Sequence, residues 1–493
     1  MKRRNFLSTT ATVAGFTIVP RHVLGGIGYI APSDRLNLAC IGTGTQGTRV
    51  MLQLLKLPGI QVVAVADPVK EDTRYQNWGE FELRSNIRRA IEEPAWDEGV
   101  KGCRAGREPA RQIVDKWYGK QKDMTFKACT AYEDFRELLE KESGIDAVSV
   151  GTPDHQHAQV AVKAMLKGKH VFCQKPMTNA AYEARLMADT AIKTGMATQV
   201  ATANASSEST DLLCEMVWSG AIGGVRDVYL WSNRPVWQTG FTQLPEEEKI
   251  PKGFNWDLWL GRAEYRPFSY SYTHTVFRSW FDFGTGALGD MGCYAFASIY
   301  RALRLGDVSV VEASGNTIVG VVNGNPTQIP YVSHPHAMHA DFRFDARAGM
   351  PPVVIHWMDG GLKPTRPKEF EEDNINFAPD GLMFVGDYGT ILCGFQGDNP
   401  KMIPASRQKN YLKPAPMIER SKGHYEDWIA ACRGGKPARC TFDATAPLTE
   451  ALTLGVIAMR TRKKLIWDPV KRTTGSEDAD KLLKPTYRAG WEL

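Results

Sequence analysis

The chain has 493 residues, of which 43% are hydrophobic and 23% charged, and its net charge is +5. This length predicts about two to three domains, and the scattering of Lys and Arg among acids argues against a nucleic-acid-binding stripe. The nine cysteines form no C-x-x-C pair. They therefore favour free buried thiols over a disulfide framework.

The N-terminus resembles a twin-arginine export signal. Arg3 and Arg4 are followed by Phe6 and Leu7, and then by a mildly apolar run that is too short to span a bilayer. A chance basic N-terminus is the alternative. We expect residues 1–33 to be signal and linker, and the mature protein to be periplasmic or otherwise exported, with no membrane association after signal removal.

The next segment has the pattern of a dinucleotide site. An apolar strand over 36–41 leads into a tight turn and a helix over 48–57, and a second strand over 61–66 ends at Asp67. Glycines in such a turn let the backbone approach a pyrophosphate, which the helix N-terminus attracts. The expected cofactor contacts here are Gly42, Thr43, Gly44, Thr45, Gln46, Gly47 and Asp67.

Asp67 bears on the choice of cofactor. A carboxylate at this position accepts hydrogen bonds from ribose hydroxyls and repels a 2′-phosphate, which favours NAD over NADP. NADP remains the alternative, because Arg104, Arg107 and Arg111 in the insertion that follows could fold back toward the adenosine end. A solvated helix face would equally explain these arginines.

A further unit predicts a strand over 147–150, a helix over 155–167 and a strand over 170–173. Alternating strands and helices predict a parallel, doubly wound α/β sheet, which binds ligands beyond the carboxyl ends of its strands. Asp154 is a plausible N-cap of the helix. The side chains expected at the nicotinamide end are Thr152, Pro153, His157, Gln174 and Lys175.

Several motifs together resemble the Gfo/Idh/MocA family of nicotinamide-dependent sugar oxidoreductases. They are "GTGTQG", "GTPDHQHA", "VFCQKPMT", "WDLWLG", "WFDFGTGALGDMGCY", "GHYEDWIAACRGGKPA" and "TEALTLGVIAMRTRKKLIWD". The resemblance implies an NAD-binding Rossmann domain over 34–176. It also implies an α+β domain over 177–493 with a large, open, mostly antiparallel sheet, whose helices at 424–470 pack back on the Rossmann domain. Such sheets often form homodimers or homotetramers.

The resemblance also implies roles for individual residues. Lys175 matches the catalytic lysine of the family, although Gln174 stands where the family usually has Glu. Asp290 matches the aspartate of the Gly-Asp-x-x-x-His motif, in which Tyr294 replaces the usual histidine. Asn204-Ala205 stands where close relatives often have Gly-His, so a polar substrate contact is in doubt there.

Oxidation of a sugar hydroxyl requires a group that takes its proton. We predict that Lys175 lowers the pKa of Tyr294, which exchanges the proton, while Asp290 orients sugar hydroxyls. The neutral Gln174 would leave the field of Lys175 available to Tyr294, or would only position the loop. Tyr294 could instead be a core or interface aromatic, Asp290 a helix cap, and Lys175 a solvated side chain.

Asn204, Arg278, Trp280 and Asp282 are the candidate substrate contacts. Trp280 offers a flat apolar face to a sugar ring, although core packing is the alternative, and a surface ion pair is the alternative for Arg278 and Asp282. We expect no metal site, because His334 and His336 would share one strand face while His339 points away and no acid completes a set.

The primary functional prediction is an NAD-dependent oxidoreductase that acts on a sugar or glycoside, with tightly bound cofactor. The alternative is a glycosidase on the same fold, which oxidises one ring carbon, eliminates the aglycone, adds water and re-reduces the ring with no net redox change. A cofactor-bound binding or assembly protein without turnover is the third reading. The sequence names neither the sugar nor the carbon.

Overall fold

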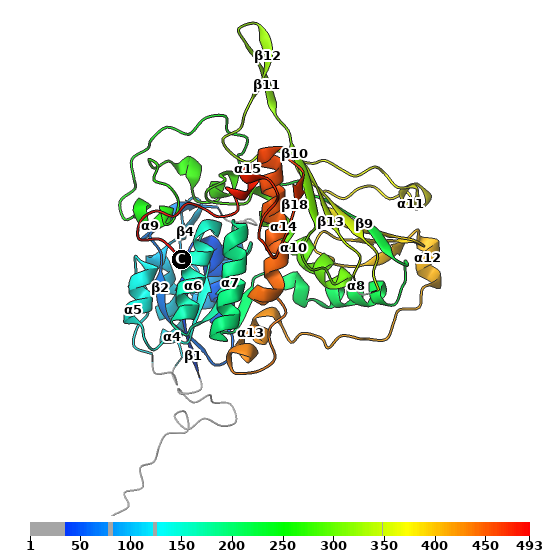
Figure 1. Ribbon diagram of the computed structural model, residues 1–493. Coiled ribbons are helices and arrows are strands. Elements are labelled where there is room, and N and C mark those ends of the chain that lie inside the picture. Colours follow the sequence, from blue (N-terminus) through cyan, green and yellow to red (C-terminus); the bar gives the residue numbers. More distant parts are fainter. Residues whose placement is uncertain (1–34, 77–81, 122–125, 348) are drawn as a thin grey trace, which may run out of the picture.

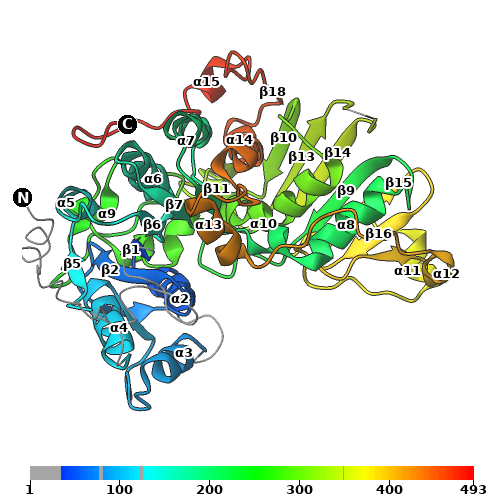
Figure 2. The same cartoon turned by 90° about the horizontal axis from the view of Figure 1, so that it is seen from below.

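The computed structural model describes residues 35–76, 82–121, 126–347 and 349–493. The expected signal at 1–33 lies outside the described residues. The chain forms two halves, a parallel sheet with helices on both faces and a larger sheet covered by helices, which lie side by side in Figures 1 and 2. None of the described helices is long and apolar enough to cross a membrane.

The first half is the expected doubly wound fold. Its six strands are all parallel. The strands over 36–41, 147–150 and 170–173 coincide with apolar runs of the sequence. In spatial order the strands are β5 (Thr130–Tyr132), β2 (Ile60–Ala66), β1 (Leu36–Ile41), β6 (Ala147–Val150), β7 (His170–Cys173) and β8 (Thr198–Val200). This is the strand order of a dinucleotide-binding sheet, with the switch point between β1 and β6.

Helices cover both faces of this sheet because its strands alternate their side chains between two cores. Leu38 and Cys40 face one core and Ala39 and Ile41 the other. On the first face lie α2 (Thr45–Leu54), α3 (Glu82–Ile91) and α4 (Arg107–Gly119), and on the second lie α5 (Phe135–Lys141), α6 (His157–Leu166) and α7 (Ala181–Thr194). A two-stranded piece, β3 (Asp72–Tyr75) with β4 (Cys103–Ala105), belongs to the insertion after β2.

The parallel sheet continues past the boundary expected at residue 176. β8 pairs in parallel with β7, and α7 connects them, so the first half includes residues up to Val200. The sequence did not show this because a strand of three residues carries little periodic signal.

The second half is built on an eight-stranded sheet. Every neighbouring pair is antiparallel except β9 with β14, as expected for a mostly antiparallel sheet. The order is β17 (Lys401–Ile403), β16 (Thr390–Cys393), β15 (Gly381–Gly386), β9 (Val225–Trp231), β14 (Val353–Met358), β13 (Met338–Phe344), β10 (Val310–Gly315) and β18 (Leu465–Ile466). The helices on one face are α8 (Glu208–Trp218), α10 (Gly286–Leu303) and α14 (Phe442–Thr461).

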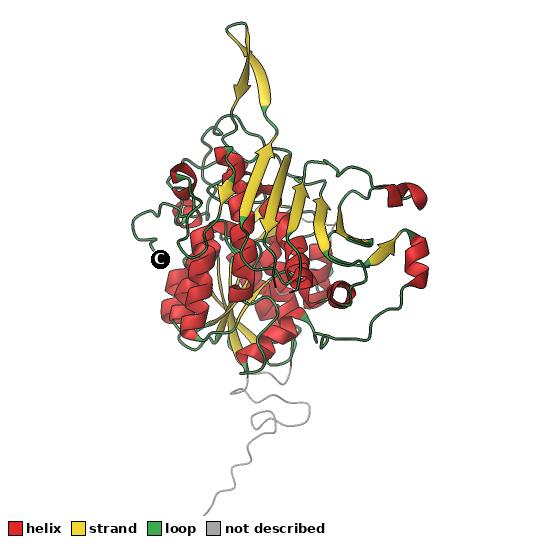
Figure 3. Ribbon diagram, turned by 45° about the vertical axis from the view of Figure 1, so that its right-hand side comes forward, coloured by secondary structure: helices red, strands yellow, loops and turns green. Residues whose placement is uncertain are grey.

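Smaller elements complete this half. They are α9 (Trp256–Leu260), α11 (Lys368–Glu372), α12 (Ala405–Asn410), α13 (His424–Cys432), α15 (Glu477–Asp480) and the short 3-10 turns η3 (Ala203–Ser206), η4 (Tyr270–Tyr272) and η5 (Val276–Ser279). A further 3-10 turn, η2 (Asp154–Gln156), lies between β6 and α6 in the first half. The hairpin β11 (Ile318–Val322) with β12 (Asn325–Ile329) projects from the body of the protein in Figures 1 and 3.

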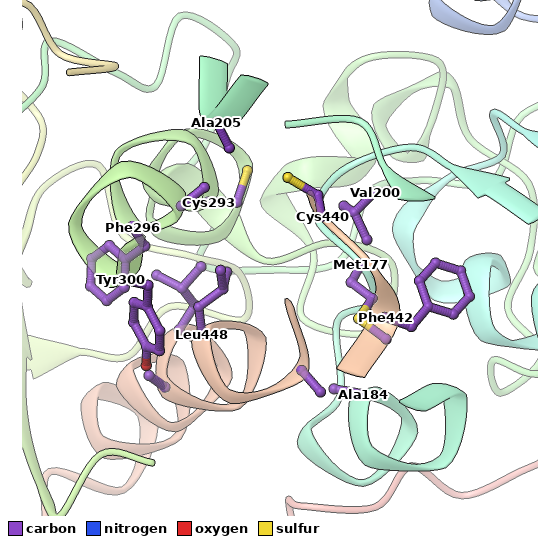
Figure 4. Close-up of a cluster of buried hydrophobic side chains, with 14 of the residues drawn as sticks. Met177, Ala184, Val200, Ala205, Cys293, Phe296, Tyr300, Cys440, Phe442 and Leu448 are labelled. Atoms are coloured by element: carbon purple, nitrogen blue, oxygen red, sulfur yellow. The ribbon is translucent and has the colours of Figure 1, made fainter. Parts of the chain in front are cut away.

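One hydrophobic core joins the two halves. Met177 and Val200 of the first half belong to the same buried cluster as Phe296 of α10 and Phe442 and Leu448 of α14 (Figure 4). From the other side, α13 packs on β7, where Tyr425 stacks on Phe172 at 5.1 Å between ring centroids. The helices of 424–470 therefore do pack back on the Rossmann half. This shared core fixes the end of β7 against α10.

The glycine turn provides a stability test. A Cβ built on Gly47 would lie 1.9 Å from the carbonyl oxygen of Gly42, whereas one built on Gly119 in α4 meets open space. Alanine in a helix is normally more stable than glycine by about 0.5–1 kcal/mol, so the sign of the effect is diagnostic. We expect Gly47→Ala to lower the free energy of unfolding by roughly 1–3 kcal/mol or more. Gly119→Ala should be neutral or stabilising. Urea denaturation measures both, and equal effects would contradict the close packing.

Candidate active site

A cavity of about 410 Å³ runs from the glycine turn to Lys175. It lies at the carboxyl ends of the parallel strands, and residues of the second half line its other side. Its walls include backbone of the glycine turn, polar groups from both halves and several aromatic rings. Among the lining residues are Gly42, Gly44, Thr45, Gln46, Asp67, Tyr75, Thr152, Pro153, Asp154, Gln174, Lys175, Trp237, His274, Arg278, Asp290, Tyr294 and Trp491.

The glycine turn fits a dinucleotide. Gly42 has φ +82°, and a Cβ there would lie 2.4 Å from the backbone nitrogen of Thr152, so the two loops touch. Gly44 is the N-cap of α2 and carries no side chain that could cap the first-turn amide groups. A pyrophosphate can serve that purpose, because these amides and the helix dipole attract an anion. Gly44, Thr45 and Gln46 line the cavity, whereas Thr43 and Gly47 serve the packing of the turn behind it.

Asp67 ties the glycine turn to the end of β2. Its Oδ2 accepts a hydrogen bond from the backbone nitrogen of Thr43 at 2.7 Å, and its Oδ1 accepts one from that of Val69 at 2.8 Å. The carboxyl is buried, which raises its pKa, but it still lines the cavity. Both the expected ribose contact and a role in loop structure are therefore available to Asp67.

The three arginines of the insertion form ion pairs or backbone contacts instead of lining the cavity. Arg107 donates to the backbone oxygen of Asp67 at 2.9 Å. Arg104 pairs with Asp97, and Arg111 pairs with Glu108 and Asp115 on α4. The insertion contributes Tyr75 to the cavity instead, and this ring stacks on His274 at 3.6 Å between centroids. Tyr75 also covers Gly44, whose built Cβ would lie 3.0 Å from the ring.

A buried ion cluster forms the opposite end of the cavity. Lys175, just after β7, donates from Nζ to the Oδ1 and to the backbone oxygen of Asp290, both at 2.8 Å. Arg278 of η5 donates from Nε to the same Oδ1 at 2.8 Å. The side chains of Lys175 and Asp290 are 9% and 8% exposed. Two cations therefore share one carboxylate, and the cluster carries a net positive charge.

These contacts fix the protonation of the pair. Burial opposes the charge on Lys175, but Asp290, with smaller contributions from Tyr294 and Cys293, offsets the effect of burial and raises the pKa of the ammonium above its usual value. Burial likewise opposes the charge on Asp290, but Lys175 and Arg278 hold its pKa well below the usual range. Lys175 is therefore a cation and Asp290 an anion at neutral pH.

Tyr294 does not have the lowered pKa that we predicted. Lys175 lies over its ring, with Nζ 4.8 Å from the centroid, which is a cation–π contact. Lys175 does act to lower the pKa of Tyr294, but burial acts more strongly and the net pKa is raised. Tyr294 is consequently a neutral phenol that can donate a hydrogen bond, and the predicted net lowering of its pKa is not found.

Other predicted site residues lie outside the cavity lining. His157 is 1% exposed, and its ring nitrogens lie 2.8 Å from the backbone oxygen of Pro176 and 2.9 Å from that of Thr152. It therefore holds the two loops that carry Lys175 and Thr152, and does not face a cofactor. Burial lowers its pKa to about 4.

Three of the expected substrate contacts also lie outside the cavity lining and make contacts within the protein. Asn204 donates from Nδ2 to the backbone oxygens of Tyr294 and Gln396, and so fixes α10 from behind. Trp280 is 1% exposed and donates to the backbone oxygen of Ser271. Asp282 pairs with Arg266 at the surface. Of the four candidates, Arg278 lines the cavity.

The sequence reasoning missed several lining residues. Asp154 was expected to cap a helix, but it opens the turn η2, makes no side-chain cap there and faces the cavity. His274 and Trp491 come from segments without a recognisable motif. Trp491, two residues from the end of the chain, packs beside Phe135 of α5 and under Arg136. No sequence pattern marks Trp491, because its position at the cavity depends on the tertiary path of the C-terminal segment.

A cluster of possible metal ligands lies on the large sheet, away from the cavity lining. Ligand atoms of His339, Asp341 and His356 lie within 4.8 Å of one another. Asp341 and Asp227 already accept hydrogen bonds from the two ring nitrogens of His356, and despite partial burial they raise its pKa. Ion pairs thus account for this arrangement. His334, in contrast, is buried and bonds to the backbone oxygen of Gly284.

Two family models match the chain. Residues 105–202 match the oxidoreductase family with an NAD-binding Rossmann fold, and residues 222–316 match the C-terminal alpha/beta domain of the same family. The chain carries both domains of the Gfo/Idh/MocA oxidoreductase family. The expected fold class is confirmed, and the cavity lies between these two domains.

Curated relatives match over short stretches. Levoglucosan dehydrogenase of Pseudarthrobacter phenanthrenivorans is 31% identical over 21% of this chain and 27% of its own length. A glycosyl hydrolase family 109 protein of Stenotrophomonas maltophilia is 29% identical over 35% of this chain and 29% of its own. The scyllo-inositol 2-dehydrogenase (NAD(+)) of Bacillus subtilis is 38% identical over 14% and 20%. These three matches each span less than a third of the relative's own length.

Solved structures share the fold over most of the chain. The WlbA dehydrogenase from Bordetella pertussis, solved with NADH and UDP-GlcNAcA, has a TM-score of 0.53 and 13% identity, and the match covers 88% of this chain and 99% of that one. GenD2 from gentamicin A biosynthesis, solved with NAD, has a TM-score of 0.52 and 16% identity over 88% and 97%. At these identities the likeness shows the fold.

The ion cluster can be tested by removing its one negative charge. Asp290→Asn leaves Lys175 and Arg278 as buried neighbours without the carboxylate that they both bond. Removal of one partner from a buried pair costs about 3–5 kcal/mol of unfolding free energy, whereas an exposed pair contributes at most about 1 kcal/mol. We therefore expect a large loss in urea denaturation for Asp290→Asn and a small one for the control Asp282→Asn, which breaks the surface pair with Arg266. Equal losses would show that the cluster does not stabilise the fold.

Proposed function

We propose that this protein is an NAD-dependent oxidoreductase that transfers hydride between the cofactor and a hydroxyl-bearing carbon of a sugar or glycoside. The observation that carries the proposal is the cavity itself, which begins at a phosphate-binding turn and ends at the Lys175–Asp290–Arg278 cluster. When bound, NAD supplies or accepts the hydride. The dehydrogenase relatives that match, named for levoglucosan and scyllo-inositol, support a carbohydrate substrate.

The charged end of the cavity suits a sugar hydroxyl. Lys175 is a fixed cation, so it can donate to the hydroxyl oxygen and stabilise negative charge that develops there as the proton leaves. Tyr294 is neutral and can donate a second hydrogen bond from the same wall. Trp237 also lines the cavity, and its flat face suits the C–H face of a sugar ring.

NAD remains favoured over NADP, because Asp67 presents a buried carboxyl where the ribose is expected and Arg104, Arg107 and Arg111 do not line the cavity. Tight binding is supported by the stacked pair of Tyr75 and His274, which comes from two separate segments and covers the glycine turn. Such a cover would slow cofactor exchange between turnovers.

The second candidate is an NAD-dependent glycosidase that returns its cofactor unchanged. The specific observation in its favour is the match to proteins named as glycosyl hydrolase family 109, including one over 35% of this chain. The same cavity residues serve transient oxidation, elimination and re-reduction. An exported protein lacks a ready supply of fresh NAD, which also favours recycled cofactor.

One assay separates these activities. Purified protein is mixed with NAD and a panel of sugars and aryl glycosides, and NADH and free aglycone are both measured. Accumulating NADH identifies the oxidoreductase, and aglycone without net NADH identifies the glycosidase. Lys175→Ala should lower kcat by about 100-fold or more in either case. Lys167→Ala, which changes a surface lysine paired with Glu140, is the matched control. Full turnover by Lys175→Ala would refute the assignment.

We also propose export by the twin-arginine route and a homodimer or homotetramer. Support for export is the Arg3-Arg4-x-Phe-Leu pattern in the sequence. We expect replacement of Arg3 and Arg4 by lysine to retain the protein in the cytoplasm, as measured by cell fractionation, while the unchanged chain reaches the periplasm. Equal distribution of the two proteins would leave the chance basic N-terminus as the explanation.

A further inference from the structure

Asp154 is a buried carboxyl at the reactive end of the cavity. It follows β6 in the "GTPDHQHA" loop and is 2% exposed. It lines the same cavity as Lys175, Arg278 and Asp290. The cavity therefore holds two carboxyl groups near the position where a sugar hydroxyl would react, one on each half of the protein.

The two carboxyls have different partners. Asp290 accepts hydrogen bonds from both cations, Lys175 and Arg278. Among the described residues, the hydrogen-bond donor to Asp154 is the hydroxyl of Thr285, which lies 3.2 Å from Oδ2. Asp154 thus has no cation of its own, although both cations lie close enough to influence it.

This difference sets the two proton affinities apart. Burial raises the pKa of Asp154, the charges of Arg278 and Lys175 lower it, Asp290 raises it again, and the result is about 7. The pKa of Asp290 lies well below the usual range for the reason given above. The groups that face Asp154 from the surrounding elements are Arg278 of η5, Asp290 and Cys293 of α10, Thr285 before α10, Cys173 of β7 and Lys175 after β7.

The neighbouring groups are poorly suited to accept a proton. Lys175 and Arg278 are engaged as donors to Asp290. The carboxylate of Asp290 is already shared by these two cations, so its proton affinity is low. Tyr294 lies with its ring under Lys175 and keeps its phenolic proton. His157 is turned away toward two backbone oxygens.

We propose that Asp154 is the acid–base group of this site, and that it exchanges a proton with the hydroxyl of the bound sugar. The proposal rests on the proposed function and deepens it. In oxidation the C–H bond breaks and its electron pair leaves as hydride for NAD. The O–H bond breaks, its proton goes to the Asp154 carboxylate, and its electron pair becomes the second bond of the carbonyl. In reduction the protonated carboxyl returns the proton.

The roles of the two carboxyls then divide. Asp290 holds Lys175 and Arg278 in place and keeps Lys175 charged, which stabilises the oxygen as it loses its proton. Asp154 holds the proton itself. In many enzyme sites two carboxyl groups have different pKa values because their surroundings differ, and this difference is used to assign the acid–base role.

The test uses the full chain with Asp154→Asn, which keeps the shape of the side chain, and Asp282→Asn as the matched control outside the cavity. For the unchanged protein, kcat/KM for oxidation should rise with pH through about 7, because the base must be ionised, and reduction should fall over the same range. Asp154→Asn should lose about 100- to 10,000-fold in kcat together with this inflection, with KM changed little. Asp282→Asn should keep both.

A second measurement is independent of turnover. In infrared spectra of the protein without substrate, one protonated-carboxyl band that disappears as pH rises through about 7 should be present in the unchanged protein and missing from Asp154→Asn, whereas the band of Asp359, whose pKa burial also raises to about 7, should remain in both. Thr285→Val removes the hydrogen bond to Asp154, so the infrared midpoint and the rate inflection should move together to higher pH.

The outcomes separate the two proposals. If no sugar or glycoside is turned over, the proposed function fails while the infrared titration still tests the carboxyl. If turnover occurs and Asp154→Asn keeps the inflection near pH 7, or if its infrared titration matches that of the unchanged protein, Asp154 is not the acid–base group.

Discussion

The contact between Lys175 and Asp290 joins the two halves of the protein at the reactive end of the cavity. Lys175 lies two residues after the end of β7 in the first half, and Asp290 lies on α10 in the second. A buried pair of this kind tolerates little displacement, because each charge has lost its water and depends on the other. The continuous core beneath it, with Met177, Val200 and Phe296, supplies the rigidity that this geometry needs.

The same contact determines the electrostatics of the site. By attracting both Lys175 and Arg278, Asp290 becomes a weak base and leaves Asp154 without a bonded cation. A fixed cation and a carboxyl that titrates near neutral pH thus come to line one cavity. Sugar oxidation requires both kinds of group, one to stabilise the oxygen and one to take the proton.

Much of the fold could be predicted from the sequence, because its signals are local. The strands Leu36–Ile41, Ala147–Val150 and His170–Cys173 were predicted with the bounds that the structure has, since each is a short apolar run bounded by glycine or polar residues. The strand Thr198–Val200 was missed because it is only three residues long, and its place beside β7 depends on tertiary packing.

Site residues that belong to recognisable motifs could be predicted from the sequence. Lys175, Asp290 and Arg278 were named from the sequence and lie together, whereas Asn204, Trp280, Asp282 and His157 were named and lie behind the cavity or at the surface. Sequence patterns place a residue on a loop, but they do not say which way the ring of His157 turns or which acid takes the cations. Asp154 illustrates this limit of sequence patterns, because its pKa depends on Arg278, Thr285 and Asp290, which are all more than 100 positions away in the chain.

This arrangement provides a physical explanation for Gln174, the neutral residue beside Lys175. We had expected an amide at this position to leave the field of Lys175 available to Tyr294. The charge of Lys175 does act on Tyr294, but burial of the phenol outweighs it, and Asp290 of the opposite domain is the bonded partner of Lys175. Gln174 is 5% exposed and lines the cavity, and its backbone nitrogen is fixed on the oxygen of Val150 at 2.8 Å. A glutamate here would add another carboxylate near Lys175 and, by repulsion, would raise the proton affinity of nearby acids. The amide avoids this, so that Asp290 remains the partner of Lys175 and Asp154 can titrate near neutral pH.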